Sequence, residues 1–441
     1  MKKIDKRIKR GLNYSIKDGV AWSVNDGLGS SYVSPYMITA LKASDAQIGL
    51  LTSVPSLVAN ISQLESPKLM ARMSRKKLVT ILVFLQAIMW IPILSIAFLV
   101  SSSILDILLA PFLVIIFYTL YLMFGGLAGP AWSSWMGDLV PDKERGRFFG
   151  RRNEIIGFAG LTSMLLAGFF LDIFKMGSLL FGFATLFFIA MVARLVSRHF
   201  LIKQYEPEFK EEEKYYFSFS QFVRQIWQRG DRANNFGRFT LYVTLMSFAV
   251  NLAAPFFAVY MLRSLKFSYT VFIIITVSSL LIRLLSMPWW GRFSDKYGRL
   301  RTLRIGGFLI PAIPILWMFS SNPAYLVLVE MFGGLVWAAF DLGSFNFIYD
   351  AVTRPKRGCC FAYFNVLNGL GIFIGATLGG LLATHPIIGL TPILFLFLIS
   401  GVLRLLFSIT MLPQLREVRK VQPSRPLWYF MGSFIRRRFH I

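Results

Sequence analysis

The sequence predicts an all-α polytopic membrane protein in which twelve transmembrane helices form two pseudo-repeated six-helix bundles. Three observations predict it. Of 441 residues, 55% are hydrophobic and only 16% are charged, whereas a soluble domain carries about 25% charge. Apolar runs long enough to cross a bilayer recur along the whole chain, and positive charge gathers in alternate connections between them. A soluble enzyme with one appended membrane anchor is therefore excluded.

Twelve segments contain the roughly 20 mostly apolar residues that a membrane span needs. The first is the most polar of them. No compact apolar stretch follows the basic residues Lys2 to Arg10, so we expect no cleaved signal peptide. The predicted spans are 16–41, 46–65, 77–100, 106–138, 153–173, 177–199, 237–262, 267–290, 302–320, 324–352, 363–384 and 391–413.

The charge distribution predicts how the chain lies in the membrane. There are 47 Lys and Arg against 22 Asp and Glu, a net charge of +25. In a soluble protein this excess would suggest nucleic acid. Here nearly all the cations lie in the N-terminal arm, in every second connection and in the C-terminal tail, as cytoplasmic loops require. We expect both termini in the cytoplasm, a plasma (inner) membrane location, no nucleic-acid partner, and contact with anionic lipid headgroups.

One long connection, 200–236, separates the two predicted bundles. The first bundle is 1–199 with its basic arm, the second is 237–413, and a basic tail, 414–441, follows. Apolar residues at helical spacing between Phe219 and Trp227 predict an amphipathic helix in the connection, lying on the cytoplasmic surface of the membrane.

The halves also share sequence. The segment Asp138-Leu-Val-Pro-Asp-Lys-Glu-Arg145-Gly146 recurs as Asp350-Ala-Val-Thr-Arg-Pro-Lys-Arg357-Gly358. Upstream, Met123-Phe-Gly-Gly-Leu127 recurs as Met331-Phe-Gly-Gly-Leu335. Repeated halves of the same orientation are typical of transporters.

The connection between the eighth and ninth spans carries a motif. It reads Gly291-Arg-Phe-Ser-Asp295-Lys296-Tyr-Gly298-Arg299-Leu-Arg301 and resembles the G-x-x-x-D-[RK]-x-G-R-x-[RK] signature of the major facilitator superfamily. The first-half counterpart, Pro67-Lys-Leu-Met-Ala71-Arg72-Met-Ser74-Arg75-Lys-Lys77, keeps the cations but lacks both glycines and the aspartate. The resemblance covers nearly the whole chain. It implies the major facilitator fold, with spans one, four, seven and ten around a central cavity, but not the substrate.

Within the motif we expect gating residues. Gly291 and Gly298 are expected to allow a close helix approach and a tight turn. Asp295, followed by Arg299, is expected to face the positive N-terminus of the fifth span, near Arg151 or Arg152. Such a clasp would close the cytoplasmic side. The alternative is that the cations of the motif only fix the orientation of the chain in the membrane.

The repeated segments predict two further gating pairs. Asp138 is expected to pair with Arg145, and Asp350 with Arg357, each at a cytoplasmic span end. These are gating or folding residues rather than solute ligands.

Two acids lie near the middle of the predicted spans. At 1.5 Å per residue, Asp26 and Asp341 are each roughly 13 Å from the cytoplasmic boundary, close to the midplane of a ~30 Å core. Burial disfavours the charged form of a carboxylate, so either is a candidate proton carrier. Two alternatives stay open: an ion pair with Arg283 or Arg404, and direct binding of a cationic solute.

Polar and aromatic residues share helical faces in the first, fourth and tenth spans. Trp and Tyr rings in a wet cavity can stack on sugars, aromatic compounds or cations; alternatively they pack against neighbouring helices or form the interfacial belt. Because the resemblance places these spans and the seventh at the cavity, the expected solute-binding residues are Trp22, Asn25, Asp26, Trp132, Asn251, Trp337 and Asp341.

The resulting functional hypothesis is secondary active transport of a small organic solute, proton-coupled, with efflux as one direction. Uptake of a sugar or another polar metabolite, by uniport or symport, is the alternative. A transport-dead sensor or chaperone and a lipid scramblase are hypotheses of other classes. The sequence has no GxxxxGK[ST] nucleotide-binding loop and suggests no catalytic set, metal site or cofactor. We expect a monomer.

Overall fold

The computed structural model describes residues 6–141, 145–174, 178–208, 233–352, 357–384 and 391–418. All regular structure in these ranges is helical. We call residues 6–208 the first half and residues 233–418 the second half. The amphipathic helix expected between Phe219 and Trp227 and most of the tail 414–441 lie outside the described residues.

The first half begins with a long, repeatedly adjusted helix. Residues 6–40 are helical throughout, so the helix begins well before the predicted span at residue 16, because the basic arm continues the same helix. The elements of this half are α1 (Lys6–Asn25), the π-helix η1 (Asp26–Ser30), α2 (Ser31–Pro35), the π-helix η2 (Tyr36–Ala40), α3 (Asp45–Ser62), η3 (Gln63–Glu65), α4 (Ser66–Met70), α5 (Arg75–Ile88), α6 (Trp90–Ser101), α7 (Ala110–Leu139), α8 (Arg145–Phe174) and α9 (Leu179–Lys203).

The second half repeats this order of long helices. Its first and third predicted spans are interrupted, the third at Pro311. The elements are α11 (Ala233–Asn251), α12 (Ala254–Val259), the π-helix η5 (Tyr260–Ser264), α13 (Tyr269–Tyr297), α14 (Arg299–Leu309), α15 (Ala312–Leu316), α16 (Pro323–Ala351), α17 (Arg357–Leu382), α18 (Pro392–Met411) and η7 (Leu412–Gln414).

Nine helical segments within the described ranges are long and apolar enough to cross a membrane. The three other predicted spans correspond to the helical segments 6–40, 45–65 and 299–316. The first two carry many polar residues and the third is broken, so they do not meet the same criterion. The all-helical membrane fold is confirmed, whereas the count of twelve spans stays a prediction.

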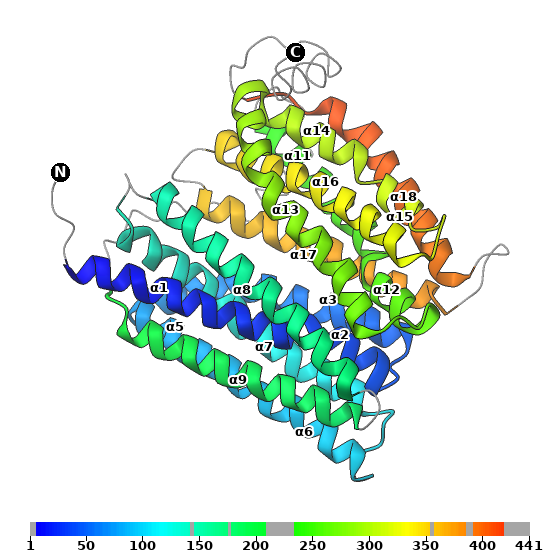
Figure 1. The fold of residues 1–441 in the computed structure, drawn as a ribbon. Coiled ribbons are helices and arrows are strands. Elements are labelled where there is room, and N and C mark those ends of the chain that lie inside the picture. Colours follow the sequence, from blue (N-terminus) through cyan, green and yellow to red (C-terminus); the bar gives the residue numbers. More distant parts are fainter. Residues whose placement is uncertain are drawn as a thin grey trace, which may run out of the picture.

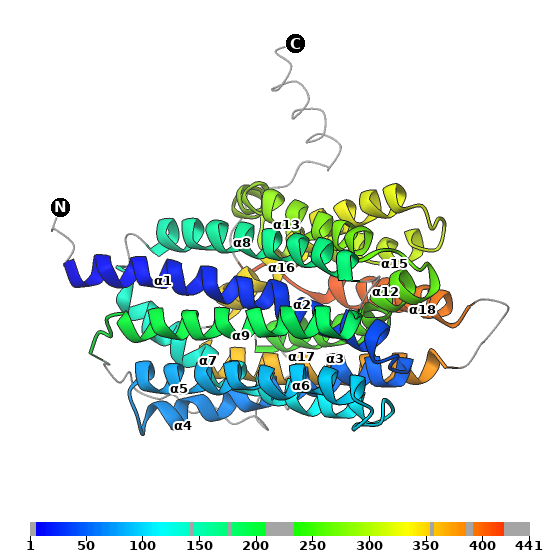
Figure 2. The same cartoon turned by 60° about the horizontal axis from the view of Figure 1, so that its bottom comes forward.

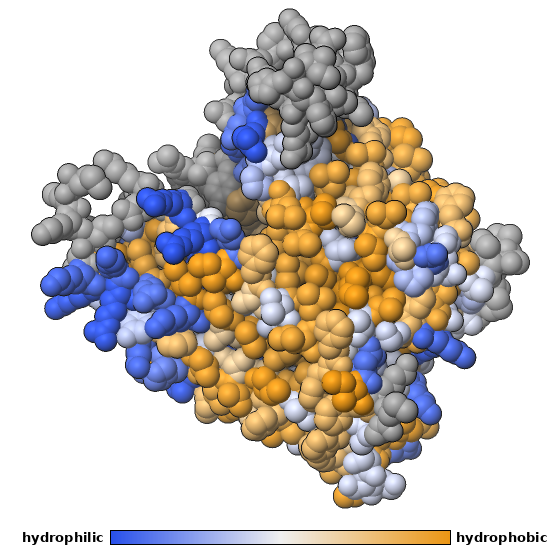
Figure 3. All heavy atoms as spheres, in the orientation of Figure 1, coloured by the Kyte–Doolittle hydropathy of each residue, from blue (hydrophilic) through white to orange (hydrophobic). Residues whose placement is uncertain are grey.

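The long helices run along a common direction (Figure 2). We call the end where α1 begins and α7, α9 and α16 end the basic end, and the opposite end the far end. Figure 3 shows one face of the molecule covered mainly by hydrophobic side chains, with hydrophilic side chains gathered near the start of α1 and a smaller group at the far end. This distribution is the one a lipid-embedded body requires.

The two halves meet along α3 and α17 (Figure 1). The approach is close because small residues face each other. A Cβ added to Gly49 would lie 2.5 Å from the carbonyl oxygen of Ala376, and one added to Gly369 would lie 2.9 Å from the Asn60 amide nitrogen. Small residues at helix contacts in membranes allow this backbone proximity.

At the far end the two halves are joined by polar contacts and by a shared core. Asp45 forms an ion pair with Arg263, and the Tyr269 hydroxyl donates to Thr39 Oγ1 over 2.7 Å. Asp172 accepts the backbone N–H groups of Tyr269 (2.9 Å) and Thr270 (2.8 Å). One buried hydrophobic cluster contains residues of both halves here.

Toward the basic end, the described buried clusters belong to one half each. The cluster that includes Phe239 and Phe347 lies in the second half, and that which includes Leu82 and Trp135 lies in the first. The ribbons of the two halves converge at the far end and diverge toward the basic end (Figure 1). The conformation is therefore closed at the far end.

Asp138, which is expected to pair with Arg145, forms an ion pair with a cation of α5. Asp138 Oδ2 lies 2.5 Å from Nη1 of Arg75, whose side chain is 1% exposed. The physical reason is that the start of α5 packs against the end of α7 within one bundle. The side chain of Arg145 lies outside the described residues.

The second half has the same arrangement. Asp350 Oδ2 lies 3.0 Å from Nε of Arg299, which also donates to the Asn346 carbonyl over 2.8 Å. Thus Asp350 pairs with the motif arginine of α14. The side chain of Arg357, its expected partner, is not among those described. Arg75 and Arg299 occupy the same position in the two copies of the motif, so the repeat extends to these contacts.

The two motif glycines have different environments. Gly298, between α13 and α14, has φ 104° and ψ 150°, a conformation that only glycine adopts without strain. Its first-half counterpart, Ser74, has φ −61° and caps α5 by accepting the Lys77 N–H, which explains why no glycine is needed there. A Cβ at Gly291 would meet no atom within 4 Å, so the close helix approach expected there is absent in this conformation.

The expected clasp is also absent in this conformation. Asp295 is exposed and forms an ion pair with none of the described residues. Arg152 is buried and turned toward Asp18 instead, while Arg151 is exposed. The clasp is missing because α8 and α13 contact each other where Gly157 meets Leu284 and from that level toward the far end, whereas Asp295 lies near the basic end.

Candidate functional site

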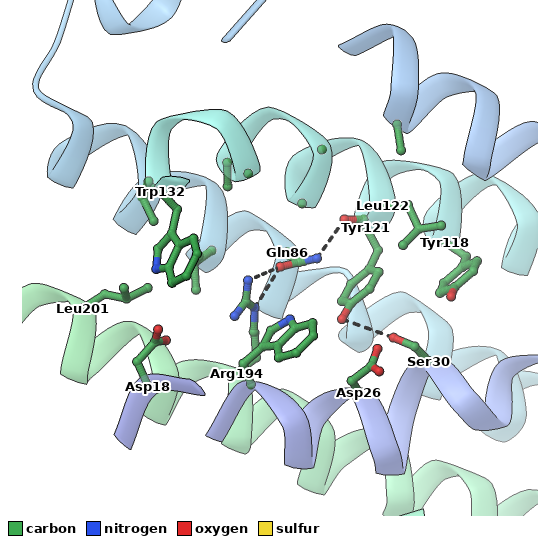
Figure 4. Close-up of a pocket in the computed structure, with 18 of the residues that line it drawn as sticks. Asp18, Asp26, Ser30, Gln86, Tyr118, Tyr121, Leu122, Trp132, Arg194 and Leu201 are labelled. Atoms are coloured by element: carbon green, nitrogen blue, oxygen red, sulfur yellow. Dashed lines mark hydrogen bonds between the residues drawn. The ribbon is translucent and has the colours of Figure 1, made fainter. Parts of the chain in front are cut away.

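A cavity of about 540 Å³ lies within the first half. Its walls come from α1, η1, α3, α5, α7, α8 and α9, and we call it the first-half cavity. Aromatic rings and four ionisable side chains line it, as Figure 4 shows for most of them. The polar and aromatic lining residues are Asp18, Trp22, Asp26, Ser30, Gln86, Tyr118, Tyr121, Trp132, Arg152 and Arg194.

Asp26 lies at a local change of helix type. It is the first residue of the π-helix η1, and such segments inside α-helices occur frequently at functional sites. Its half-buried side chain faces the cavity with Ser30 and Tyr121 nearby (Figure 4), and the Ser30 hydroxyl donates to the Tyr121 hydroxyl over 3.4 Å. Within the part of the chain that the structure describes, no cation forms an ion pair with Asp26.

Asp18, the second acid of the cavity, is held by its neighbours. The Ser197 hydroxyl donates to Oδ1 over 2.6 Å, and Nη2 of Arg152 lies 3.8 Å from Oδ2. Arg152 itself donates from Nε to the carbonyl and hydroxyl oxygens of Ser15, both at 3.2 Å. Its guanidinium lies 4.7 Å from the ring centroid of Trp132, a cation–π contact.

Arg194 is buried beside the cavity and its donors are well occupied. Its Nε and Nη2 donate to Oε1 of Gln86 over 2.8 and 2.5 Å, and Nη1 donates to Ser197 over 3.0 Å. Gln86 in turn donates to the carbonyl oxygen of Tyr121 over 3.2 Å. Arg194 is thus oriented by a neutral amide, with its charge directed between Asp18 and Asp26 (Figure 4).

Asn25 does not line the first-half cavity, contrary to the expectation that it binds solute. Its side chain is fully buried. Its amide donates to the Tyr121 hydroxyl over 2.8 Å and its carbonyl oxygen accepts from Trp90 Nε1 over 2.9 Å. A residue bonded in this way orients Tyr121, and its own polar atoms face away from a solute. Trp22 and Trp132 do line the cavity, and Trp22 is 41% exposed.

The expected residues of the second half lie elsewhere in this conformation. Trp337 lines a separate cavity of about 300 Å³, which we call the second-half cavity. Asn251 donates to the Ser247 carbonyl of its own helix over 2.9 Å. Asp341 forms an ion pair with Arg283, one of the alternatives left open by the sequence. The single site expected between both halves is therefore divided, because the conformation separates their cavity-facing helices.

Sequence reasoning missed several residues of the first-half cavity. Asp18, Gln86 and Arg152 are not among the residues that the sequence predicts to bind solute. The available signal was the polarity of single residues inside apolar spans: Gln86 and Arg194 each interrupt an otherwise apolar run. Which of them meet cannot be obtained from spacing, since they come from different helices.

Comparison with known proteins agrees with this architecture. A family model described as Major Facilitator Superfamily matches residues 20–231 and 239–438. "Solute carrier family 22 member 18" of Rattus norvegicus is 27% identical over 146 residues, 32% of this chain. The match spans 35% of that relative's length.

Solved structures resemble the chain over most of its length. A mutant of the nucleoside transporter NupG gives a TM-score of 0.71 at 14% identity, covering 92% of this chain and 100% of that chain. A bacterial homologue of the iron transporter ferroportin, in an inward-facing state, gives 0.68 at 13% identity, covering 92% and 98%. At these identities the likeness shows the fold alone.

Proposed function

Because the chain belongs to the major facilitator superfamily, we propose that it carries a small organic solute by alternating access and couples this transport to protons through Asp26. Membership of this family, together with the long apolar helices, makes the chain a multi-pass membrane protein of a solute-transporter family. The single observation that carries the proposal is the first-half cavity, where a carboxylate at a π-helical segment pairs with none of the described cations.

The contrast between the two cavity acids supports Asp26 as the proton carrier. Asp18 already has a hydroxyl donor and a neighbouring arginine, so its charge is compensated. Asp26 lacks such a pair within the described residues, and burial disfavours its charged form. A carboxylate that can be neutralised either by a proton or by a cationic solute couples the binding of the proton to the binding of the solute. Asp341, held by Arg283, is a second candidate that would need that pair to open.

The chemistry of the lining favours an amphipathic organic cation as the solute. Arg152 and Arg194 are both occupied by protein acceptors, which leaves Asp26 as the charged group available to a ligand. Trp22 and Tyr118 add aromatic surface beside it, and aromatic faces attract cations. Exchange of this cation for a proton gives efflux.

The distribution of positive charge supports a cytoplasmic basic end in the plasma membrane. With that orientation, the far-end contacts make the present conformation inward-facing. The protein would act as a monomer, with its basic segments near anionic lipid headgroups. The gating residues Asp295 and Gly291 would act in the opposite conformation, in which the basic end closes.

Transport in proteoliposomes tests the proposal. With an imposed pH gradient, we expect gradient-driven movement of a fluorescent organic cation such as ethidium. Asp26→Asn should abolish the gradient dependence, because an amide cannot bind and release the proton. Asp106→Asn, which changes an exposed acid in the α6–α7 connection, is the matched control and should transport normally.

The same vesicles distinguish the alternatives. If Asp26→Asn left gradient-driven flux unchanged and Asp341→Asn abolished it, the coupling residue would be Asp341. If a hexose and no organic cation moved, the uptake hypothesis would replace efflux. If no tested solute moved in any preparation that binds ligand, a sensor role would gain support.

A further inference from the structure

The second-half cavity has an unusual lining. Its volume is about 300 Å³ and its walls come from α11, α12, η5, α13, α15, α16 and α18. Aliphatic and aromatic side chains form most of the surface, including Phe257, Trp317 and Trp337. Only three lining side chains are polar: Thr276, Glu330 and Arg404. A small apolar pocket with a few polar groups is the usual form of a small-molecule site, and this volume is at the lower end of the usual range.

Arg404 is a buried cation whose charge the protein does not compensate. Its side chain is 2% exposed, and a hydrogen bond from Nη2 to the Val250 carbonyl is long at 3.4 Å. Among the described residues, its Nε has no partner and no carboxylate pairs with the guanidinium. A buried, uncompensated charge costs several kcal/mol, so an anionic partner is expected.

The comparison with the first half makes this clearer. Arg194 lies on α9, the last long helix of the first half, as Arg404 lies on α18, the last of the second. Arg194 donates three hydrogen bonds to Gln86 and Ser197. Arg404 donates to no side chain among the described residues. The Ser400 hydroxyl, one turn away on the same helix, donates to the Ala249 carbonyl.

Glu330 supplies the opposite charge in the same cavity. It projects from α16, and Trp317 Nε1 donates to its Oε1 over 3.0 Å. Glu330 and Arg404 both line the cavity but form no ion pair with each other, nor does any other described cation pair with Glu330. One positive and one negative group are thus separated by apolar and aromatic surface.

We propose that the second-half cavity is a second binding site, distinct from the first-half cavity, for a compact zwitterion. Its carboxylate pairs with the Arg404 guanidinium, a geometry that allows two parallel hydrogen bonds. Its cationic group faces Glu330 and the rings of Trp317 and Trp337, and its apolar body contacts the remaining wall. A ligand with only a negative charge would be repelled by Glu330, and a ligand with only a positive charge would be repelled by Arg404. Each therefore binds more weakly than a zwitterion.

Thermal unfolding of the purified full-length protein tests this proposal, because a ligand that binds the native state raises its apparent stability. The probes are L-phenylalanine, 3-phenylpropionate, which lacks the amine, and phenethylamine, which lacks the carboxylate. We expect concentration-dependent stabilisation by phenylalanine. In Asp26→Asn, which lacks the carboxylate proposed to bind cations in the first-half cavity, each single-charge analogue should be at least about tenfold weaker in apparent affinity than phenylalanine.

Variants assign the effect to the cavity. Arg404→Gln and Glu330→Gln should each weaken phenylalanine binding at least about tenfold, whereas Asp26→Asn, in the first-half cavity, should leave it unchanged. Arg404→Gln removes an uncompensated charge, so its ligand-free melting temperature should equal or exceed that of the wild type. The proposal is overturned if phenylalanine gives no shift, if its shift survives Arg404→Gln, or if either single-charge analogue stabilises Asp26→Asn as well as phenylalanine does.

Discussion

At the scale of single residues, the contact between Gln86 and Arg194 orders the charged wall of the first-half cavity. Gln86 accepts two of the hydrogen bonds that the buried guanidinium donates. Gln86→Leu would leave those donors without acceptors, and unsatisfied buried charged groups cost about 2–3 kcal/mol or more. We predict a corresponding loss of stability, measured as a lower apparent melting temperature of the purified protein.

The matched variant for this prediction is Gln86→Glu, which keeps an acceptor at the same place and adds an opposite charge. It should retain stability close to that of the wild type. A Gln86→Leu protein as stable as Gln86→Glu would contradict the assignment, because it would show that the amide does not compensate Arg194.

The same residues show what a sequence can and cannot predict about a site. Helical spacing places Asp26 on the inner face of the first span, and the cavity confirms that position. The same spacing placed Asn25 beside it, yet Asn25 is fully buried against Tyr121 and Trp90. Spacing defines a helix face but not the partner opposite it, and the π-helix that begins at Asp26 shifts the face locally.

At the scale of elements, the turn between α13 and α14 depends on one glycine. Gly298 has φ 104°, a conformation that costs a non-glycine residue about 1–3 kcal/mol. We predict that Gly298→Ala lowers the apparent melting temperature by an amount in that range. Gly291→Ala, in the same motif and with open space around the added methyl group, should change it little.

One outcome of these melting-temperature measurements would contradict the prediction for Gly298. If Gly291→Ala were as destabilising as Gly298→Ala, the turn conformation would not explain the role of Gly298.

The comparison with Ser74 explains why the first-half copy of the motif lacks glycine: the Ser74 backbone is in an ordinary extended conformation and the Ser74 hydroxyl caps the next helix. A sequence shows the missing glycine but not the altered turn that compensates for it.

The N-terminus of α13 is capped by a residue of the other half. Asp172 accepts the N–H groups of Tyr269 and Thr270, while Ser268 accepts that of Val271, so three of the first free donors are satisfied. Loss of such a cap costs about 1 kcal/mol. Because this cap forms between the halves, we predict that Asp172→Ala shifts the equilibrium about fivefold toward conformations open at the far end.

Distances between spin labels measure this shift. Labels at Ser102 and Ser321, both exposed in far-end connections of opposite halves, should show an increased population of longer distances in Asp172→Ala. The native Cys359 and Cys360 are replaced by serine in all samples. Glu65→Ala removes an acid that pairs only with Lys68 at the basic end and should leave the distribution unchanged. An unchanged distribution in Asp172→Ala would show that the cap does not hold the far end.

At the scale of the whole molecule, composition, charge alternation and the internal repeat are sufficient to predict the architecture. They are not sufficient to predict the conformation, because spacing within single helices does not determine which residues of different helices meet. Asp295 is without an ion-pair partner among the described residues here, whereas Asp172 and Arg263 have partners in the other half. The clasp expected at Asp295 stays a prediction, for a conformation in which α8 and α13 meet at the basic end. The same separation divides the solute-binding residues expected from the two halves.

Orientation and conformation together predict from which side the first-half cavity is reached. Trp22 lines that cavity and is 41% exposed, while contacts between the halves close the far end. In a cysteine-free background with Trp22→Cys, a membrane-impermeant maleimide should react at least about tenfold faster in inside-out than in right-side-out vesicles. The cytoplasmic basic end expected from the charge distribution is the reason. Arg72→Cys and Ser321→Cys, exposed at the basic and far ends, calibrate the two vesicle preparations. Asp172→Ala should raise the right-side-out rate at Trp22→Cys, since it weakens the far-end contacts. If Trp22→Cys without Asp172→Ala reacted faster in right-side-out vesicles, either the predicted orientation or the assignment of the closed end would be wrong. The rates at the two calibration sites would show which of them is wrong.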